Sequence, residues 1–302
     1  MQVVNSSTPA VTIQNFRLTN IAPDFYPSSH ISFERSSPQL LSLQKHRIQQ
    51  NPENHQNHAV SDCLLQRNGY SIHLVSSLMQ RIKANTLIKR MYASRGYQTE
   101  SASVFSADPS QYTLEAQQSG QLIGTLTLAI DTDTGLLADT LYRTELDQFR
   151  RQGHRLCELS KLAFNPESSS KEIFASLFHM AYIFARHIHN VDDAFIEINP
   201  RHAAFYKRML GFRQVGELRT CPRVNAPAVL LHLDLAYMKK QIATQAEQFD
   251  LKTRSIYPHF LSRNKEREIT RLIQSKQTSH TTPFLIHKSN PTSHHPSYLR
   301  PA

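Results

Sequence analysis

A glutamate within an apolar run is the first candidate for chemistry in this sequence. Residues Arg155–Phe164 alternate apolar and polar side chains ahead of a proline-containing loop, which predicts a central strand. Because side chains alternate along a strand, Glu158 and Ser160 should face one way and Lys161 the other. A carboxylate placed beside a reacting group can accept a proton from it. The alternative is that Glu158 only forms an ion pair, with Lys161 or with a neighbouring strand.

A tyrosine on a short predicted helix is the second candidate. Residues Asn199–Phe212 are typical of a strand end followed by a short helix, which Gly211 can close in the left-handed conformation. Tyr206 lies on that helix, and a phenol with an ordinary pKa near ~10 is suited to protonating a departing thiolate. The alternative is that Tyr206 is a core aromatic residue.

These candidates lie in the middle of a regular pattern of predicted elements. We expect a helix over 72–94, a hairpin of Tyr112–Gln117 and Gln121–Ile130 turning at Ser119-Gly120, and further elements that alternate between strand and helix. Those further elements are the strand 155–164, a helix over 173–188, strand 194–198, helix 201–210, strands 212–217 and 229–235, and a closing helix 236–251. The order predicts a mixed α/β fold with a central sheet and helices on its faces.

The composition places this pattern between two polar ends. Residues 1–70 are rich in Ser, Gln, Asn, His and Pro and are expected to be a mostly disordered leader. Residues 71–252 form the expected folded domain. The net charge of +10 is concentrated in 253–302, with eight Lys/Arg and two Asp/Glu, which we interpret as a disordered basic tail. Nucleic-acid binding by a folded basic groove is therefore not expected.

Several classes of protein are disfavoured by the same composition. The eight glycines form neither a Walker loop nor a GxGxxG turn, which argues against NTPases and Rossmann dehydrogenases. Three widely spaced cysteines and no signal sequence favour a reducing, cytoplasmic location. No stretch approaches the ~20 apolar residues of a membrane-spanning helix, so we expect at most peripheral membrane contact. The histidines lack metal-site spacing, and no metal is expected.

Four segments resemble one enzyme family. Asn199–Phe212 resembles the "N…A…FY…LGF" signature of the GCN5-related N-acetyltransferase (GNAT) superfamily, and Glu158–Phe164 resembles the "E-x-S-R-x-a-v" strand of the FeeM-type N-acyl amino acid synthases and their relatives, the acyl-homoserine-lactone synthases. Tyr92–Tyr97 and Cys221–Leu235 also look like elements of this family. The resemblance covers about residues 72–245. It implies a GNAT, or acyl-CoA N-acyltransferase-like, fold with a central mixed twisted sheet flanked by helices.

The resemblance also implies an activity and roles for the candidates. It implies transfer of a long-chain fatty acyl group from acyl carrier protein to the amine of an amino acid, with Glu158 as general base and Tyr206 as general acid. Glu158 must then be partly desolvated, because an ordinary glutamate pKa near ~4.3 is poorly matched to an amine. Lys161 stands where the family usually has arginine, so a bidentate contact would become a single-point one. The substrate-binding candidates are Ser160, Lys161, Leu162, Ala163, Phe164 and Asn199, and the backbone N–H groups around Leu162–Phe164 are candidates for stabilising an oxyanion.

The loop Asn165–Lys171 bears on the acyl donor. It has no glycines to approach the pyrophosphate of coenzyme A, but its serines and lysine could hold the single phosphodiester of a carrier-protein phosphopantetheine at a helix N-terminus. These residues are Ser168, Ser169, Ser170 and Lys171. The alternative is that the serines only cap the helix. An acidic carrier protein could be steered by basic residues, for which the candidates are Lys171, Arg186, Arg201, Arg150 and Arg151.

Other functions stay open on the sequence alone. An acyl-homoserine-lactone-synthase-like enzyme using S-adenosylmethionine is disfavoured by the absence of tryptophan, which those enzymes usually carry. An acyl-CoA-dependent N-acyltransferase is a further possibility within the enzyme class. A non-catalytic binder of carrier protein or nucleic acid is the alternative from a different class. In each enzymatic case the thioester is a co-substrate, and no tightly bound cofactor is implied.

Overall fold

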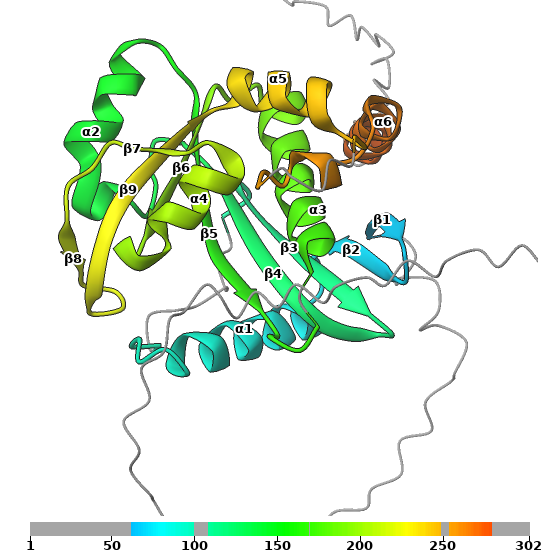
Figure 1. The fold of residues 1–302 in the computed structure, drawn as a ribbon, viewed down its shortest axis with the longest axis horizontal. Helices are drawn as coiled ribbons and strands as arrows, with labels where there is room; N and C mark the ends of the chain where they lie inside the picture. The colour runs from blue at the N-terminus through cyan, green and yellow to red at the C-terminus, as the bar shows by residue number, and fades with distance from the viewer. Residues whose placement is uncertain (1–61, 100–107, 169, 249–253, 280–302) are drawn as a thin grey trace, which may run out of the picture.

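A computed structural model describes residues 62–99, 108–168, 170–248 and 254–279 of the chain. One mixed sheet runs through this part in the order β1-β2-β3-β4-β5-β6-β9-β7, with β8 paired to β9 (Figure 1). The strands are β1 Cys63–Arg67, β2 Tyr70–Leu74, β3 Gln111–Gln118, β4 Gln121–Ile130, β5 Leu156–Phe164, β6 Asp193–Ile198, β7 Arg213–Gln214, β8 Arg219–Cys221 and β9 Ala226–Asp234. Within the described sheet, β5 and β6 are parallel and the other neighbours are antiparallel.

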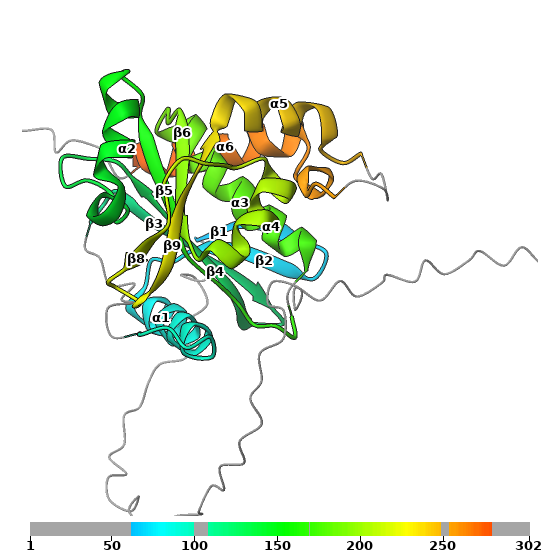
Figure 2. The same cartoon turned by 60° about the vertical axis from the view of Figure 1, so that its left-hand side comes forward.

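Helices cover both faces of the sheet. The α-helices are α1 Leu78–Ala93, α2 Asp139–Arg151, α3 Lys171–Tyr182, α4 Ala203–Leu210, α5 Leu235–Gln245 and α6 Arg263–Ser279. Helix α3 continues as a π-helix over Ile183–Ile188, and short 3-10 turns lie at Pro200–His202, before α4, and at Tyr257–His259, before α6. In Figures 1 and 2, α1 lies on the side of the sheet away from α5 and α6. The predicted mixed α/β layout is confirmed.

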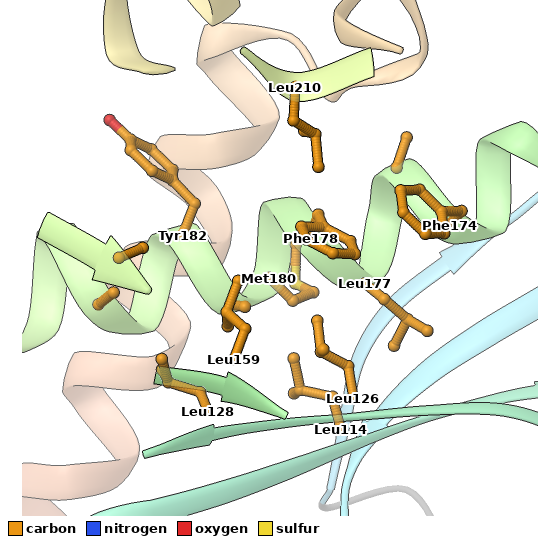
Figure 3. Packing of buried hydrophobic residues seen from close by; sticks show 14 of the residues in the cluster. Leu114, Leu126, Leu128, Leu159, Phe174, Leu177, Phe178, Met180, Tyr182 and Leu210 are labelled. Atoms are coloured by element: carbon orange, nitrogen blue, oxygen red, sulfur yellow. The ribbon is translucent and has the colours of Figure 1, made fainter. Parts of the chain in front are cut away.

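The largest core lies between α3 and the strands. Phe174, Leu177 and Phe178 point from α3 toward leucines of β3, β4 and β5, as Figure 3 shows. Two smaller clusters lie on the other face, where α2 packs over Phe195 and Leu230 and α1 packs over Ala163. The site described below lies between these two layers.

The leader was predicted to extend too far. β1 and β2 form a hairpin that turns at Asn68 and Gly69, with φ of 43° and 81°, and pairs with β3. Ile72 is fully buried in the main core. The expected helix over 72–94 therefore begins only at Leu78, where Ser77 caps it. The remainder of the predicted leader, residues 1–61, lies outside the described residues.

The basic tail was also predicted to begin too early. Phe260 is buried in the main core, and Glu266 of α6 accepts hydrogen bonds from His179 Nε2 (2.9 Å) and His187 Nε2 (2.8 Å). The backbone N–H of Leu261 donates to His179 Nδ1 at 3.0 Å. Residues 254–279 therefore belong to the folded domain, because the buried His179 of α3 and the partly buried His187 of the π-helix are hydrogen-bonded to α6. Residues 280–302 lie outside the described part.

The remaining elements follow the prediction with local differences. The hairpin at Ser119-Gly120, the strand ending at Phe164 and the closure of α4 by Gly211, with φ of 85°, are as expected. The predicted strand 212–217 is reduced to Arg213–Gln214, and the closing helix ends at Gln245. Helix α2 was not predicted, because its buried apolar side chains are limited to Tyr142 and Leu146.

Candidate active site

The candidate site begins where β5 and β6 separate. These parallel strands pair at only three positions, the last being Glu158 with Phe195, although β5 continues to Phe164 and β6 to Ile198. Beyond Glu158 the space between them opens into a cavity of about 460 Å³. Its walls come from β5, β6, the β8–β9 region, α3, α4 and the end of α1. A gap in the sheet therefore brings side chains from both faces to one place.

A β-bulge shapes the β5 side of this cavity. Thr127 of β4 faces Ser160 and Thr125 faces Ala163, so one residue of β4 stands opposite two residues of β5. Lys161 is one of these two residues of β5 and has a left-handed φ of 53°, and its carbonyl accepts a hydrogen bond from Thr125 Oγ1 at 3.0 Å. The strict alternation predicted for this strand is wrong at Lys161, because the bulge interrupts it.

The bulge has a direct consequence for the cavity wall. After it, Ala163 joins the cluster under α1, while Leu162 and Phe164 pack against the core under α3. The six predicted substrate-binding residues, Ser160, Lys161, Leu162, Ala163, Phe164 and Asn199, all line the cavity together with Glu158 and Tyr206.

Glu158 is buried at the point of separation. Its side chain is 2% exposed, and Oε2 accepts a hydrogen bond from the backbone N–H of Ala138 at 2.9 Å, just before α2. Desolvation raises the pKa of Glu158 to about 7, with the Ala138 amide opposing that rise. A carboxyl with this pKa is a competent proton acceptor near neutral pH. In the described residues, Glu158 forms no ion pair with Lys161, which was the structural alternative.

A second carboxylate and an arginine complete the polar end of the cavity. Arg223 Nη2 contacts Glu197 Oε2 at 2.7 Å, and Nη1 donates to the carbonyl of Leu137 at 2.8 Å. The Glu197 charge contributes to the raised pKa of Glu158, and the Arg223 charge opposes it. Sequence reasoning missed both residues. A signal for Glu197 was present, since a carboxylate interrupts the otherwise apolar end of a strand two residues before Asn199.

Lys161 is a half-buried cation that forms no salt bridge among the residues that the structure describes. Desolvation lowers the pKa of Lys161, and the nearby Glu158 charge opposes that change. The Ser160 hydroxyl beside it is buried and makes no hydrogen bond within the described chain. Buried polar groups are normally satisfied, so both groups are available to a polar ligand.

Tyr206 and Asn199 lie on the opposite wall. The Tyr206 side chain is 9% exposed, and burial raises its pKa above the ordinary value. Its ring lies 6.4 Å from that of Phe178, so it contributes to the core as well as to the cavity. The Asn199 side chain accepts from the backbone N–H of Arg201 at 3.2 Å and caps the 3-10 turn that precedes α4.

The other end of the cavity is apolar. Phe164, Phe174 and Phe178 line it, with the last two rings stacked 4.5 Å apart. Gly124 allows the Phe164 ring to lie against β4, because a Cβ there would be 2.5 Å from that ring. Leu159 and Phe178 also border a second, much smaller apolar space beyond the cavity, whose other walls include Leu128, Ala181, Tyr182, Leu233 and Met238.

The predicted phosphate-binding serines lie apart from this cavity. Ser170 caps α3 by accepting a hydrogen bond from the backbone N–H of Ile173 at 3.2 Å. Neither Ser168, Ser170 nor Lys171 lines the cavity, whereas Pro166 of the same loop does. Ser169 lies outside the described residues. In this structure, Ser170 therefore has the capping role that was the alternative interpretation.

The arginines expected to steer a partner are partly engaged within the fold. Arg150 contacts Asp131, Asp139 and Asp147 at 2.7 to 2.8 Å, so its charge is paired within the fold. Arg186 pairs with Asp192 at 2.9 Å.

A third arginine of this set lies near the cavity and has partners of its own. Arg201 Nη2 donates to the Tyr97 hydroxyl at 2.9 Å, and its guanidinium also lies over that ring.

Neither a metal-binding cluster nor a membrane-spanning helix is found among the described residues. Within the ranges that the structure describes, no cluster of His, Cys, Asp and Glu is arranged to hold a metal ion. None of the described helices has the length and apolar character needed to cross a bilayer.

Comparison with known proteins gives one family. Residues 83–234 match the family model of the N-acyl amino acid synthase FeeM. Among solved structures, the chain is similar to FeeM, an N-acyl amino acid synthase from uncultured soil microbes, with 30% identity and a TM-score of 0.52. That match covers 57% of this chain and 93% of the FeeM chain. No curated protein matches the sequence.

More distant structures carry acyltransferase descriptions as well. An acyl-CoA N-acyltransferase from Pseudomonas aeruginosa is 15% identical, with a TM-score of 0.37 and coverage of 54% of this chain and 97% of that one. An aminoglycoside N(6')acetyltransferase from Legionella pneumophila is 12% identical, with a TM-score of 0.41 and coverage of 59% and 98%.

Proposed function

Because the chain belongs to the FeeM family of N-acyl amino acid synthases and is an N-acyltransferase, we propose that it moves a long-chain fatty acyl group from acyl carrier protein to the α-amine of an amino acid. The GNAT-like fold that the sequence resemblance implied is confirmed by the similarity to FeeM. The observation that carries the proposal is the buried Glu158, with a pKa near 7, in a cavity that is polar at one end and apolar at the other.

The charges of the cavity favour an acceptor that carries a carboxylate. Glu197 is neutralised by Arg223, whereas Lys161 forms no salt bridge in the described chain and has only its electrostatic interaction with Glu158. A half-buried ammonium without a salt-bridge partner is costly, and an anionic ligand would offset that cost. Lys161 lines the same cavity as Glu158 and interacts with its charge, so an anion held by Lys161 would lie near the reacting amine. The α-carboxylate of an amino acid meets this condition, and a polyamine does not.

Glu158 removes the proton that blocks attack. An amino acid enters with its nitrogen as an ammonium, which must lose one proton before its lone pair can attack the thioester carbon. Glu158 accepts this proton directly or through water. The nitrogen then forms a bond to the carbonyl carbon, the C–S bond breaks, and the nitrogen loses a second proton as the amide forms. One proton is taken up by the thiolate and the other is released to solvent.

Two other groups of the cavity act on the departing thiolate and on the oxyanion. Tyr206 donates the proton to the departing thiolate, and its buried phenol remains protonated at the working pH because burial raises its pKa. The backbone N–H of Asn165 donates to Ile123 at 2.8 Å, so the alternation of an antiparallel pair directs the Phe164 N–H away from β4. That N–H lies on the side where β5 and β6 separate and is our candidate donor to the oxyanion.

Two features support the proposed acyl donor: the loop that follows β5 and the apolar end of the cavity. The loop at Asn165–Lys171 contains no glycine that would let backbone amides approach a pyrophosphate, which favours carrier-protein phosphopantetheine over coenzyme A. Phe164, Phe174 and Phe178 provide the apolar surface for the fatty acyl chain. With Ser170 capping α3, the phosphodiester would be held at the rim by Lys171 and the free backbone amides of the helix N-terminus.

The experiment compares donors on the full chain. Initial rates are measured with acyl carrier protein and coenzyme A thioesters of the same fatty acid, each with single amino acids and with spermidine as acceptors. The proposal predicts a higher kcat/KM for the carrier-protein thioester and no acylation of spermidine. Equal or better use of the coenzyme A thioester would refute the donor assignment, while preference for spermidine would refute the acceptor assignment.

Two substitutions of Lys161 test the carboxylate contact. Lys161→Met keeps the length of the side chain and removes its charge, so KM for the amino acid should rise about tenfold or more with KM for the donor unchanged. Lys161→Arg keeps the charge and should restore most of the affinity. Equal KM values for the amino acid in the wild type and Lys161→Met would show that Lys161 does not hold the carboxylate.

A further inference from the structure

The outward side of α1 carries large apolar side chains that the fold does not bury. Leu78, Met79 and Ile82 are 67%, 61% and 44% exposed. At 100° per residue they lie on the side of the helix opposite to its buried residues, which are Ala84, Leu87, Ile88 and Met91. No other described element covers them. Exposed apolar side chains that cluster on one face in this way mark an interaction surface.

The same outward side is positively charged. Lys83, Lys89 and Arg90 are exposed and fall within the same half of the helix as Leu78 and Ile82. The sequence of α1 contains no aspartate or glutamate to balance these cations. The surface thus combines apolar side chains at its first turns with cations from Lys83 to Arg90, and its charge is complementary to an anionic partner.

The shape of this surface favours a lipid bilayer as that partner. Figures 1 and 2 show α1 at the lower edge of the molecule, apart from α2, α5 and α6. A lone helix presents a convex ridge, which a bilayer can accommodate by admitting the apolar side chains between headgroups. A rigid protein would need a matching groove.

The position of α1 connects this surface to the cavity. Tyr92 in the last turn of α1, and Arg95 and Tyr97 just after it, line the cavity that holds Glu158. A membrane against the outward side of α1 would therefore lie on the same helix that contributes Tyr92 to the cavity wall.

We propose that the outward side of α1 binds an anionic membrane surface. Leu78, Met79 and Ile82 enter the boundary between headgroups and acyl chains, and Lys83, Lys89 and Arg90 contact lipid phosphates. This contact is peripheral and requires no membrane-spanning helix. It does not depend on the proposed acyl transfer, since lipid binding is measured without turnover.

The test is flotation of the full chain with vesicles of phosphatidylcholine alone or mixed with phosphatidylglycerol. The wild type should float with the mixed vesicles and much less with phosphatidylcholine. The variants Lys83→Glu/Lys89→Glu and Leu78→Ser/Ile82→Ser should each lower the partition coefficient at least about tenfold. Leu218→Ser is the matched control, because Leu218 is 65% exposed between β7 and β8, and it should bind like the wild type.

Folding and the alternative partner are separated by two further measurements. The circular dichroism spectrum and the rate with a short-chain, water-soluble thioester should be unchanged in both α1 variants, because neither pair of residues lines the cavity. If both variants float as the wild type does, the proposal is refuted. If they also need more acyl carrier protein to reach half-maximal rate, the surface docks an acidic protein instead.

Discussion

Replacing Glu158 by glutamine should make the protein more stable at alkaline pH while removing most of its activity. The pKa of the buried carboxyl rises from 4.5 to about 7, a change that corresponds to about 3 kcal/mol. The folded protein therefore binds this proton more tightly than the unfolded chain does. The free energy of unfolding consequently falls as the pH rises from about 4.5 to about 7 and stays lower above that range.

The free energy of unfolding of the glutamine variant does not fall in this pH range, because the glutamine side chain carries no charge. At pH 8 we expect Glu158→Gln to be more stable than the wild type by up to about 3 kcal/mol, and at pH 5 the difference should shrink to less than about 1 kcal/mol. Its side-chain oxygen can still accept the N–H of Ala138. Urea unfolding at the two pH values measures both differences.

Activity should change in the opposite direction. Loss of a general base lowers kcat by about 10²- to 10⁴-fold, and the ionisation near pH 7 should disappear from the pH profile of kcat/KM. Glu115→Gln is the matched control, because Glu115 is equally buried in β3, is hydrogen-bonded to Gln80, and does not line the cavity. A Glu158→Gln enzyme within about threefold of wild-type kcat across this range would refute the assigned base.

Three further substitutions probe other parts of the account. Tyr206→Phe should lower kcat about 10- to 100-fold with an alkyl thioester and less with an aryl thioester, whose thiol is more acidic; equal losses would exclude an acid role for Tyr206. Phe178→Ala should join the cavity to the small apolar space beyond it, shift the preferred acyl chain to greater length and cost about 3 to 5 kcal/mol of stability; an unchanged order of rates across a chain-length series would contradict this. Glu266→Gln should lower the free energy of unfolding by up to about 3 kcal/mol at pH 6, because hydrogen bonds from His179 and His187 lower the pKa of Glu266 from 4.5 to about 2. This stabilisation is lost as the pH falls from about 4.5 toward 2, so the two proteins should become equal there, and a constant difference would show that the ionised carboxylate is not its source.

The parts of the fold that depend on local sequence were predictable. The Ser119-Gly120 turn, the apolar run that ends at Phe164 and the helix closed by Gly211 each need only a few neighbouring residues to determine their conformation. The β1–β2 hairpin was missed although Asn68-Gly69 is a strong turn signal, because the apolar spacing after it also fits a helix.

The parts that depend on distant partners were not predictable. The bulge at Lys161 arises from the pairing of β5 with β4, and nothing in the Glu158–Phe164 segment alone requires it. The place of α6 depends on contacts between Glu266 and two histidines about 80 residues earlier in the chain. The Glu197–Arg223 pair joins β6 to the loop before β9 in the same way. Of these long-range contacts, the Glu197–Arg223 pair contributes to the electrostatics of Glu158.

The most direct test of the central claim is the identity of the product. The full chain is incubated with a long-chain acyl carrier protein thioester and amino acids labelled with nitrogen-15, and the products are analysed by mass spectrometry. We expect a new product in which the acyl group and the labelled nitrogen are joined in an amide. Release of free fatty acid and thiol with no labelled acyl product would contradict it.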